Sequence, residues 1–292
     1  MKIAFLIAAH NQPNYLDTLL TILQHKEVSV YVHINPNSLN QFQHILTKYQ
    51  PSSIQFYSQY KVHWGGRGVI DIEKLLLSKA YENKDNQRFI FMTGSDIICK
   101  PMQTIIDFFN KEENIKYQFI EYFKLPANEW GKNGGLDRLD HYHLYDIINV
   151  NRRWASRLDK LLNIFQTMIG IHRLKSNNNY YGGEGWWNIN REGAKILLDN
   201  FNNKNIMKSF NYTFAADEIL PHTVLANQPS LKLCNKTFRY QDWTTKPAPG
   251  TITEKYLDKI KQENIFFARK IDENKSKIII EYCIKIQQHH ND

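Results

Sequence analysis

Two adjacent carboxylates, Asp217 and Glu218, open a stretch whose apolar residues have helical spacing. A carboxylate in this position can accept a proton from an attacking hydroxyl group, which is general-base chemistry. Carboxylates in a first helical turn often serve only the helix dipole, so the surrounding sequence must decide. The segment 182–187, GGEGWW, precedes the pair, and the segment 239–243, RYQDW, follows it. Glycines allow close approach and indole rings offer apolar faces to sugar rings, so the context favours catalysis.

The candidate cations and metal ligands indicate whether the chemistry needs a metal ion. Arg269 and Lys270 could neutralise a diphosphate, although a solvated helix end is the simpler alternative. Asp96 stands alone at the end of an apolar run, and one carboxylate is a poor site for a hard divalent cation. His141 and His143 are two residues apart, which does not place both rings on one helix face, so we interpret them as polar loop residues. We therefore expect no metal and no other cofactor, with a metal-dependent enzyme using Asp96 as the alternative.

Common nucleotide-binding loops are absent, since neither G-x-G-x-x-G nor G-x-x-x-x-G-K-[ST] follows the first apolar run. The segment 65–68, GGRG, instead precedes a helical stretch. Backbone N–H groups at that helix start could bind an anion. A tight turn with glycines at positive φ is the alternative.

These residues need a scaffold, and the first hundred residues alternate between two hydrophobic periods. Apolar runs predict strands at residues 3–9, 28–34, 54–57 and 88–92. Helical spacing predicts helices at residues 13–23, 39–49 and 69–80. This alternation is typical of a mostly parallel sheet with crossover helices, which binds its ligand beyond the carboxyl ends of the strands. Those ends are Ala9-His10, Asn35, the segment after Tyr57, and Thr93–Asp96.

The second half is less regular. It predicts a strand at residues 117–121, a long loop at 124–145, and helices at 154–171, 191–201, 216–226, 253–267 and 276–287. No internal repeat or low-complexity linker divides the chain. We therefore predict one domain over residues 1–292, with a nucleotide-binding half at 1–110 and an acceptor-binding and catalytic half at 111–292.

Composition restricts the class of protein. The net charge of +8 and the pI of about 9.1 suggest an anionic partner, but no long basic run indicates a nucleic-acid arm. Three widely spaced cysteines are typical of reduced thiols in a cytosolic protein. The apolar runs are too short to span a membrane. We expect a cytoplasmic protein whose membrane contact is peripheral, on the inner face of the cytoplasmic membrane.

In order along the chain, these segments resemble glycosyltransferase family 14, the family of core-2/I-branching β-1,6-N-acetylglucosaminyltransferases and peptide O-xylosyltransferases. The segments that carry the resemblance are KIAFLIAAHNQP, VYVHINPNS, VHWGGRGVIDIEKLLL, FIFMTGSDIICKP, FIE, GGEGWWNINRE, ADEILPHTVLAN, RYQDW and FFARKID. The resemblance implies a GT-A-like α/β fold with a mostly parallel central sheet flanked by helices. It also implies a UDP-sugar donor, inversion at the anomeric carbon, and no required metal.

The resemblance assigns roles residue by residue. It places the base on Glu218, a diphosphate cation on Lys270 with Arg269 adjacent, and a further donor contact on Trp243. The predicted UDP-sugar contacts are Ala9, His10, Asn35, Gly65, Gly66, Arg67, Ser95, Asp96, Trp243, Lys246, Arg269 and Lys270. The predicted acceptor contacts are Glu121, Lys132, Arg138, Glu184, Gly185, Trp186, Trp187 and Asp217.

Two departures from the family pattern matter. The family has Asp where this chain has Asn35, which accepts a hydrogen bond without carrying charge, and Lys246 or Arg269 must replace a second diphosphate cation. We expect the transferred sugar to be GlcNAc as the first choice and xylose as the second, with a glycan or lipid-linked glycan as acceptor. We also expect a small bacterial-type member of the family that acts on a polysaccharide precursor. A basic, non-catalytic protein that binds membranes or nucleic acid is the alternative, although the sequence favours no nucleic-acid partner.

Overall fold

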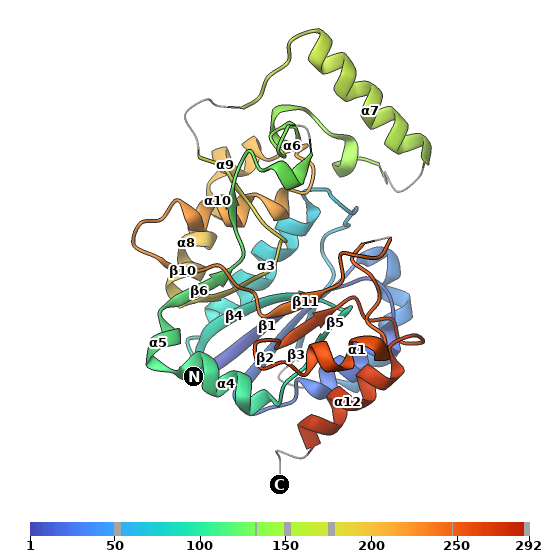
Figure 1. Cartoon of the computed structure of the whole chain (residues 1–292), viewed down its shortest axis with the longest axis vertical. Helices are drawn as coiled ribbons and strands as arrows, with labels where there is room; N and C mark the ends of the chain where they lie inside the picture. The colour runs from blue at the N-terminus through green and yellow to red at the C-terminus, as the bar shows by residue number, and fades with distance from the viewer. Residues whose placement is uncertain (50–53, 132, 149–152, 175–178, 247, 289–292) are drawn as a thin grey trace.

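The computed structural model describes residues 1–49, 54–131, 133–148, 153–174, 179–246 and 248–288. Within these residues a seven-stranded central sheet has the order β10-β6-β9-β4-β1-β2-β3 (Figure 1). Its members are β1 (Lys2–Ala9), β2 (Val28–Ile34), β3 (Ile54–Tyr57), β4 (Asn86–Thr93), β6 (Tyr117–Ile120), β9 (Trp187–Asn190) and β10 (Lys232–Cys234). β9 runs antiparallel to β4 and β6, and the other neighbours are parallel. The predicted α/β class with a mostly parallel sheet is confirmed.

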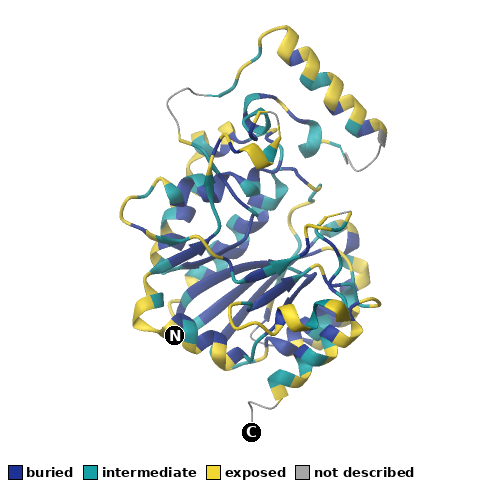
Figure 2. Cartoon of the chain, viewed as in Figure 1, coloured by how far each residue is buried: buried dark blue, intermediate teal, exposed yellow. Residues whose placement is uncertain are grey.

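Helices cover both faces of this sheet, which explains why β1 is apolar along its whole length. Phe5 packs on one face among side chains of α1 (Pro13–Ile22), α4 (Met102–Asn110) and α12 (Lys277–Gln288). Leu6 packs on the opposite face with α3 (Gly68–Glu82), α8 (Arg191–Asn202) and α10 (Leu220–Ala226). Figure 2 shows the buried strands between these two exposed layers.

A second, smaller sheet lies over the face that α1 covers. It has the order β11-β12-β5 and consists of β5 (Asp96–Ile98), β11 (Arg239–Gln241) and β12 (Phe267–Arg269). Ile97, Ile98 and Phe267 join the same hydrophobic cluster as Phe5. β7 (Phe123–Lys124) and β8 (Tyr181–Gly182) pair separately.

The remaining helical segments are short, except α7. They are η1 (Pro36–Phe42), α2 (Gln43–Lys48), α5 (Glu112–Ile115), η2 (Asn128–Trp130), α6 (Asp137–Asp140), η3 (Leu144–Asp146), α7 (Arg153–Met168), α9 (Lys204–Ser209), η4 (Ala216–Glu218), η5 (Glu254–Tyr256) and α11 (Leu257–Ile260). In the described part of the chain, no helix has the length and apolar character needed to cross a bilayer. The three cysteines are free, as predicted.

Three helix predictions are wrong in part. The segment 39–49 begins in a 3-10 turn and becomes α-helical only at Gln43. The segment 216–226 divides at Ile219 because Pro221, in the first turn of α10, has no N–H and disfavours helical geometry before it. The segment 253–267 holds only η5 and α11, and Phe267 begins a strand that pairs with β5 and β11.

The carboxyl ends of the parallel strands meet at one edge of the sheet, as predicted. The Ala9 carbonyl accepts a hydrogen bond from the Asn35 N–H at 2.9 Å, and the Ala8 carbonyl accepts one from Gly94 at 2.9 Å. The first two strands and β4 therefore deliver Ala9, Asn35 and the 93–96 turn to the same place.

Candidate active site

Glu218 lies in a turn that two glycine-rich segments hold in place. Ala215 enters the turn in the left-handed region, with φ of 50°, and its N–H donates to the Gly65 carbonyl at 2.7 Å. The Glu218 carbonyl accepts a hydrogen bond from the Gly183 N–H at 2.9 Å. The segments 65–68 and 182–187, far apart in sequence, therefore fix the same turn from two sides.

The Glu218 side chain is about one-third exposed and pairs with Arg138. The Nη1 of Arg138 donates to Oε2 of Glu218 at 2.6 Å. The guanidinium lies 3.7 Å from the centre of the Trp130 ring, which fixes the cation in place. In the described residues, Oε1 of Glu218 has no hydrogen-bond partner. One carboxylate oxygen is thus oriented and the other is available.

Asp217 meets different surroundings. Its residue is only partly buried, but its Oδ1 is enclosed without a hydrogen-bond partner among the described residues. Burial and the neighbouring charge of Glu218 raise the pKa of Asp217 to about 7. Gly185 packs beside it, because a Cβ there would lie 3.3 Å from Oδ2 of Asp217. Asp217 therefore supports the turn rather than facing the solvent.

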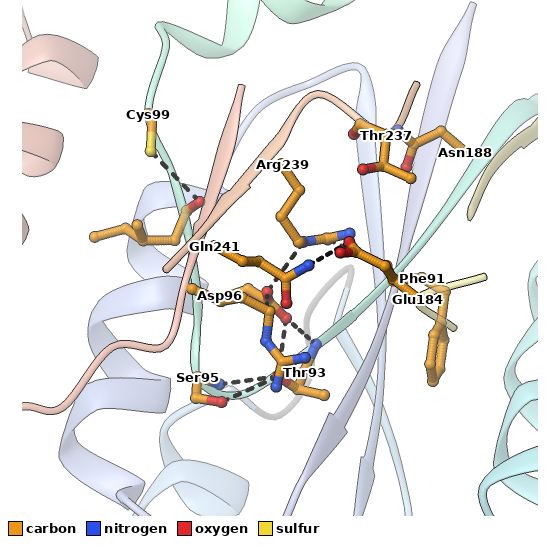
Figure 3. A network of polar contacts seen from close by, with 12 residues as sticks. Phe91, Thr93, Ser95, Asp96, Cys99, Glu184, Asn188, Thr237, Arg239 and Gln241 are labelled. Carbon is orange, nitrogen blue, oxygen red and sulfur yellow. Dashed lines mark hydrogen bonds and ion pairs between the residues drawn. The ribbon is translucent and has the colours of Figure 1, made fainter. Parts of the chain in front are cut away.

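Glu184 and Glu121 extend this acidic region. The indole N–H of Trp243 donates to Glu184 at 3.0 Å. The Gln241 amide donates to the other carboxylate oxygen, as Figure 3 shows. Burial, followed by the charge of Glu121, raises the pKa of Glu184 to about 7. Burial also raises the pKa of Glu121. The Glu184 carboxyl group can therefore hold a proton near neutral pH.

Asp96 is fully buried between the two sheets and is paired there. Its carboxylate accepts hydrogen bonds from Thr93 and from Nε of Arg239 at 3.2 Å, as Figure 3 shows, and Arg269 Nε lies 3.6 Å away. The guanidiniums of Arg239 and Arg269 lie 4.6 and 4.2 Å from the centre of the Trp186 ring. This pairing leaves Asp96 without an oxygen for a metal ion.

Of the remaining predicted cations, the structure places Lys270 near Asp96. Lys270 is exposed, and burial together with the Lys270 charge lowers the pKa of His10. The Ile271 N–H donates to the Ser95 carbonyl at 2.8 Å, which places Lys270 beside the 93–96 turn. Lys246 is also exposed. The structure therefore brings His10, Ser95 and Lys270 together at the sheet edge.

Asn35 lies at the same edge but is engaged internally. Its amide donates to the Val62 carbonyl at 3.2 Å, and its Oδ1 accepts a hydrogen bond from the Asn37 N–H. The side chain thus connects the end of β2 to the loop before the glycine-rich segment.

The backbone at the helix start, residues 65–68, already binds an anionic side chain of the protein itself, Asp146. The Asp146 carboxylate accepts a hydrogen bond from the Arg67 N–H at 2.6 Å, and the Gly66 N–H donates to the His63 carbonyl. The Arg67 guanidinium contacts Asn211 and pairs with Asp71. The prediction that these N–H groups bind a donor anion is therefore wrong for Gly66 and Arg67, whereas Gly65 contacts the Glu218 turn through its carbonyl.

Other predictions also need correction or lie beyond the described residues. Trp187 is fully buried in β9 and stacks on Phe91, so it has no face for a sugar. Trp186 is 6% exposed, and its ring packs against the guanidiniums of Arg239 and Arg269. Lys132 lies outside the described residues. His143 and His141 contact the α7 residues Asp159 and Thr167, in agreement with their interpretation as loop residues.

Sequence reasoning missed four residues of this region. Arg239 and Gln241 were seen only as part of a Trp-containing segment, although a cation and an amide in a short strand are themselves signals of buried pairing. His222 is neutral, because burial lowers its pKa to about 3, and its Nε2 accepts the Gly185 N–H at 3.2 Å. Trp64 is 62% exposed and contacts Phe214 near the Glu218 turn.

Over the described residues, no group of three or more His, Cys, Asp or Glu side chains could hold a metal ion. The arrangement instead places an oriented carboxylate, Glu218, in a region that Arg269 also reaches electrostatically. Burial raises the pKa of both Asp217 and Glu184, and the charge of Arg269 offsets a small part of this rise. Metal independence itself stays a prediction.

Comparison with protein families identifies the chain. The model of the core-2/I-branching enzymes matches residues 3–265, most of its length. The chain belongs to the core-2/I-branching enzyme family. It is therefore a glycosyltransferase, and the family resemblance seen in the sequence is confirmed.

Solved structures show weaker likenesses to this branching-family chain. S. aureus TarS, residues 1–349 in complex with UDP, matches with a TM-score of 0.32 and 19% identity over 41% of this chain. The match covers only 35% of that TarS chain. Mouse xyloside xylosyltransferase 1, in its apo form, gives a TM-score of 0.40 and 10% identity over 94% of this chain and 99% of the mouse chain. No curated protein matches significantly. These likenesses are too low to transfer a substrate to this chain.

Proposed function

We propose that this chain is an inverting, metal-independent transferase that moves a sugar from a UDP-sugar to a hydroxyl group of a glycan acceptor. The pairing of Glu218 with Arg138 supports this proposal most directly, because it orients one carboxylate oxygen and leaves Oε1 free. Asp217, adjacent in the chain, has its Oδ1 enclosed, so Glu218 is the member of the pair that can meet an acceptor.

In the proposed reaction the acceptor oxygen attacks C1 of the donor sugar from the face opposite UDP. Glu218 takes the hydroxyl proton as the new C–O bond forms. The bond from C1 to the β-phosphate oxygen breaks through an oxocarbenium-like state, and UDP leaves with the bonding electrons. The configuration at C1 is therefore inverted.

Fixed cations would stabilise the charge that grows on the departing diphosphate. Lys270 is exposed beside His10, and Arg269 lies behind them against Trp186. Lys246, predicted as a donor contact, is a further exposed cation. Donor contacts by Asn35 and Trp243, and acceptor contacts by Glu121, Glu184 and Trp64, complete the proposal. UDP-GlcNAc is the first candidate donor and UDP-xylose the second, both from the family resemblance.

The variant Glu218→Gln tests the role of the base. The amide keeps the size of the side chain but cannot accept the proton, so turnover should fall by about two to four decades while UDP binding persists. Glu192→Gln, which changes an exposed carboxylate on α8, is the matched control and should keep full turnover. Turnover at the wild-type rate in Glu218→Gln would remove Glu218 from this role.

Ligand binding tests the donor class separately. Thermal shift measurements with UDP, UDP-GlcNAc and UDP-xylose, all with EDTA present, should show stabilisation by UDP and by one UDP-sugar. Stabilisation that requires added Mn²⁺ would contradict metal independence. If no uridine nucleotide binds, the donor assignment is wrong.

A further inference from the structure

Helix α7 has its polarity reversed relative to an ordinary surface helix. The face toward the protein is polar: Asp159 and Gln166 are 5% and 2% exposed. Asp159 accepts hydrogen bonds from the Leu144 N–H at 2.8 Å and from His143 at 3.3 Å. Gln166 bonds both the N–H and the carbonyl of Tyr142, at 2.8 and 2.9 Å. The helix is therefore attached by hydrogen bonds in place of an apolar seam.

The outward face of the same helix is apolar and aromatic. The exposed side chains are Trp154, Leu158, Leu161, Ile164, Phe165, Met168 and, just beyond the helix, Ile169, each 46% to 79% exposed. Their spacing of three and four residues makes one continuous stripe. Figure 2 shows α7 as a largely exposed helix at the end of the molecule, away from the central sheet. A monomer in water gains nothing from such a stripe, so a partner must cover it.

The charges around the stripe are of one sign. Arg157 and Lys160 are exposed, and at about 100° per residue Lys160 falls on one border of the apolar face and Arg157 just inside the same border. The acidic residue between 153 and 174 is Asp159, which is buried on the opposite face. Long basic side chains beside apolar and aromatic residues match the boundary between lipid headgroups and acyl chains. The chain as a whole carries a net charge of +8.

We propose that α7 is a membrane-docking helix that lies in the interface of an anionic lipid bilayer. Trp154, Phe165 and the aliphatic side chains enter the acyl boundary, and Arg157 and Lys160 meet the phosphates. The helix does not span the bilayer, since it has only 16 residues. The polar inner face of α7 then connects the rest of the enzyme to the membrane-bound helix.

A second copy of the chain fits this face less well. A 16-residue helix is ~24 Å long, so the stripe alone supplies no more than about the ~800 Å² per partner of a standard stable interface. Two such stripes would also bring four basic side chains together without an exposed acidic residue from either helix. A bilayer has neither problem.

Docking through α7 would also orient the candidate active site. The helix packs on the segment 141–144, and the neighbouring Tyr145 contacts both Trp64 and Phe214. Phe214 in turn lies 4.9 Å from the Arg138 guanidinium that pairs with Glu218. The membrane surface would therefore lie at the end of the molecule that carries α7, and these contacts connect that end to the Glu218 turn.

Vesicle sedimentation tests the proposal without donor or acceptor, so its result is independent of the proposed function. The full chain should sediment with vesicles of phosphatidylcholine mixed with phosphatidylglycerol, and binding should weaken in high salt or with phosphatidylcholine alone. Leu161→Glu/Phe165→Glu should reduce the bound fraction by about tenfold or more. Ile278→Glu on α12, a similarly exposed apolar position, is the control and should bind like the wild type.

Thermal melting of all three proteins checks that each is folded, and light scattering measures their mass. Vesicle binding that survives Leu161→Glu/Phe165→Glu, or a wild-type chain that stays in the supernatant, would overturn the proposal. A lipid-free dimer that this double variant converts to a monomer would assign the face to a second copy instead.

Discussion

The proposed base Glu218 and its neighbour Asp217 are adjacent in the chain, yet their side chains meet different surroundings. Arg138 orients Glu218, while Asp217 packs against Gly185 with one oxygen enclosed. A pair of carboxyl groups separated in this way can divide two tasks, with one accepting a proton and the other holding the turn. The same environment makes a prediction about stability.

Asp217 should make the protein less stable as the pH rises toward neutrality. Its pKa is raised from 3.8 to about 7 in the folded state, first by burial and then by Glu218. The folded chain therefore binds this proton more tightly than the unfolded chain. The stabilisation is complete below about pH 3.8 and is lost as the pH passes through about 7. Asp217→Asn removes this dependence.

The measurement is the free energy of unfolding in urea at pH 5 and at pH 8. Between these values the wild type should lose about 1 kcal/mol or more relative to Asp217→Asn. Parallel pH curves for the two proteins would show that Asp217 titrates in the folded state as it does in the unfolded chain.

Single residues differ in how well the sequence predicts them. The sequence singles out Glu218 and Lys270 because charge there is combined with nearby glycine or aromatic residues, and their roles stay predictions. Trp187 was misread, since an indole that faces a ligand and one that fills a core have the same sequence signature. The contact of Asp146 with the start of α3 could not be foreseen, because Asp146 comes from η3, 79 residues away from Arg67.

At the scale of elements, the Glu218 turn depends on backbone that only glycine adopts comfortably. Gly185 has φ of +74° and its N–H donates to His222, so the segment 182–187 is held against the turn. A side chain at this position must also fit beside Asp217. The turn is therefore sensitive to a change that leaves every charged group in place.

Gly185→Ala should lower turnover by about tenfold or more, because a small displacement of the catalytic group misaligns the reacting atoms. UDP affinity, measured by thermal shift, should change little. Gly170→Ala is the matched control: φ is +69° there, and among the described residues a Cβ meets nothing within 4 Å. It carries similar backbone strain without a neighbour, so its turnover should match the wild type. Equal losses in both variants would assign the effect to strain alone.

Elements also differ in how far local sequence determines them. β1 and β2 were predicted at nearly their observed bounds, because a strand buried on both faces is rich in apolar residues along its whole length. The short edge strand β3 was also predicted at its observed bounds. β5, β9 and β12 were not predicted. Each is three or four residues long and obtains its hydrogen bonds from strands distant in sequence, so no local period marks it. Pairing with distant strands, and not the local sequence, determines that these segments form strands.

At the scale of the molecule, Asp96 joins the two sheets. It follows β4 of the central sheet through the Thr93 turn, and it begins β5 of the small sheet. Its carboxylate faces Arg239 on β11 and Arg269 on β12. The small sheet thus reaches the central sheet through one buried negative charge between two guanidiniums, with Trp186 stacked against them.

Asp96→Asn should therefore destabilise the whole fold. Removing this negative charge takes the ion-pair partner away from the buried Arg239 and the partly buried Arg269. Breaking a buried ion pair by removing one partner costs about 3–5 kcal/mol. The free energy of urea unfolding measures the loss. Asp199→Asn is the control, since Asp199 pairs with Lys195 on the exposed face of α8 and should leave this free energy nearly unchanged. If both variants unfold at the same urea concentration as the wild type, Asp96 does not hold the sheets together, and its charge is then free for a role in donor binding.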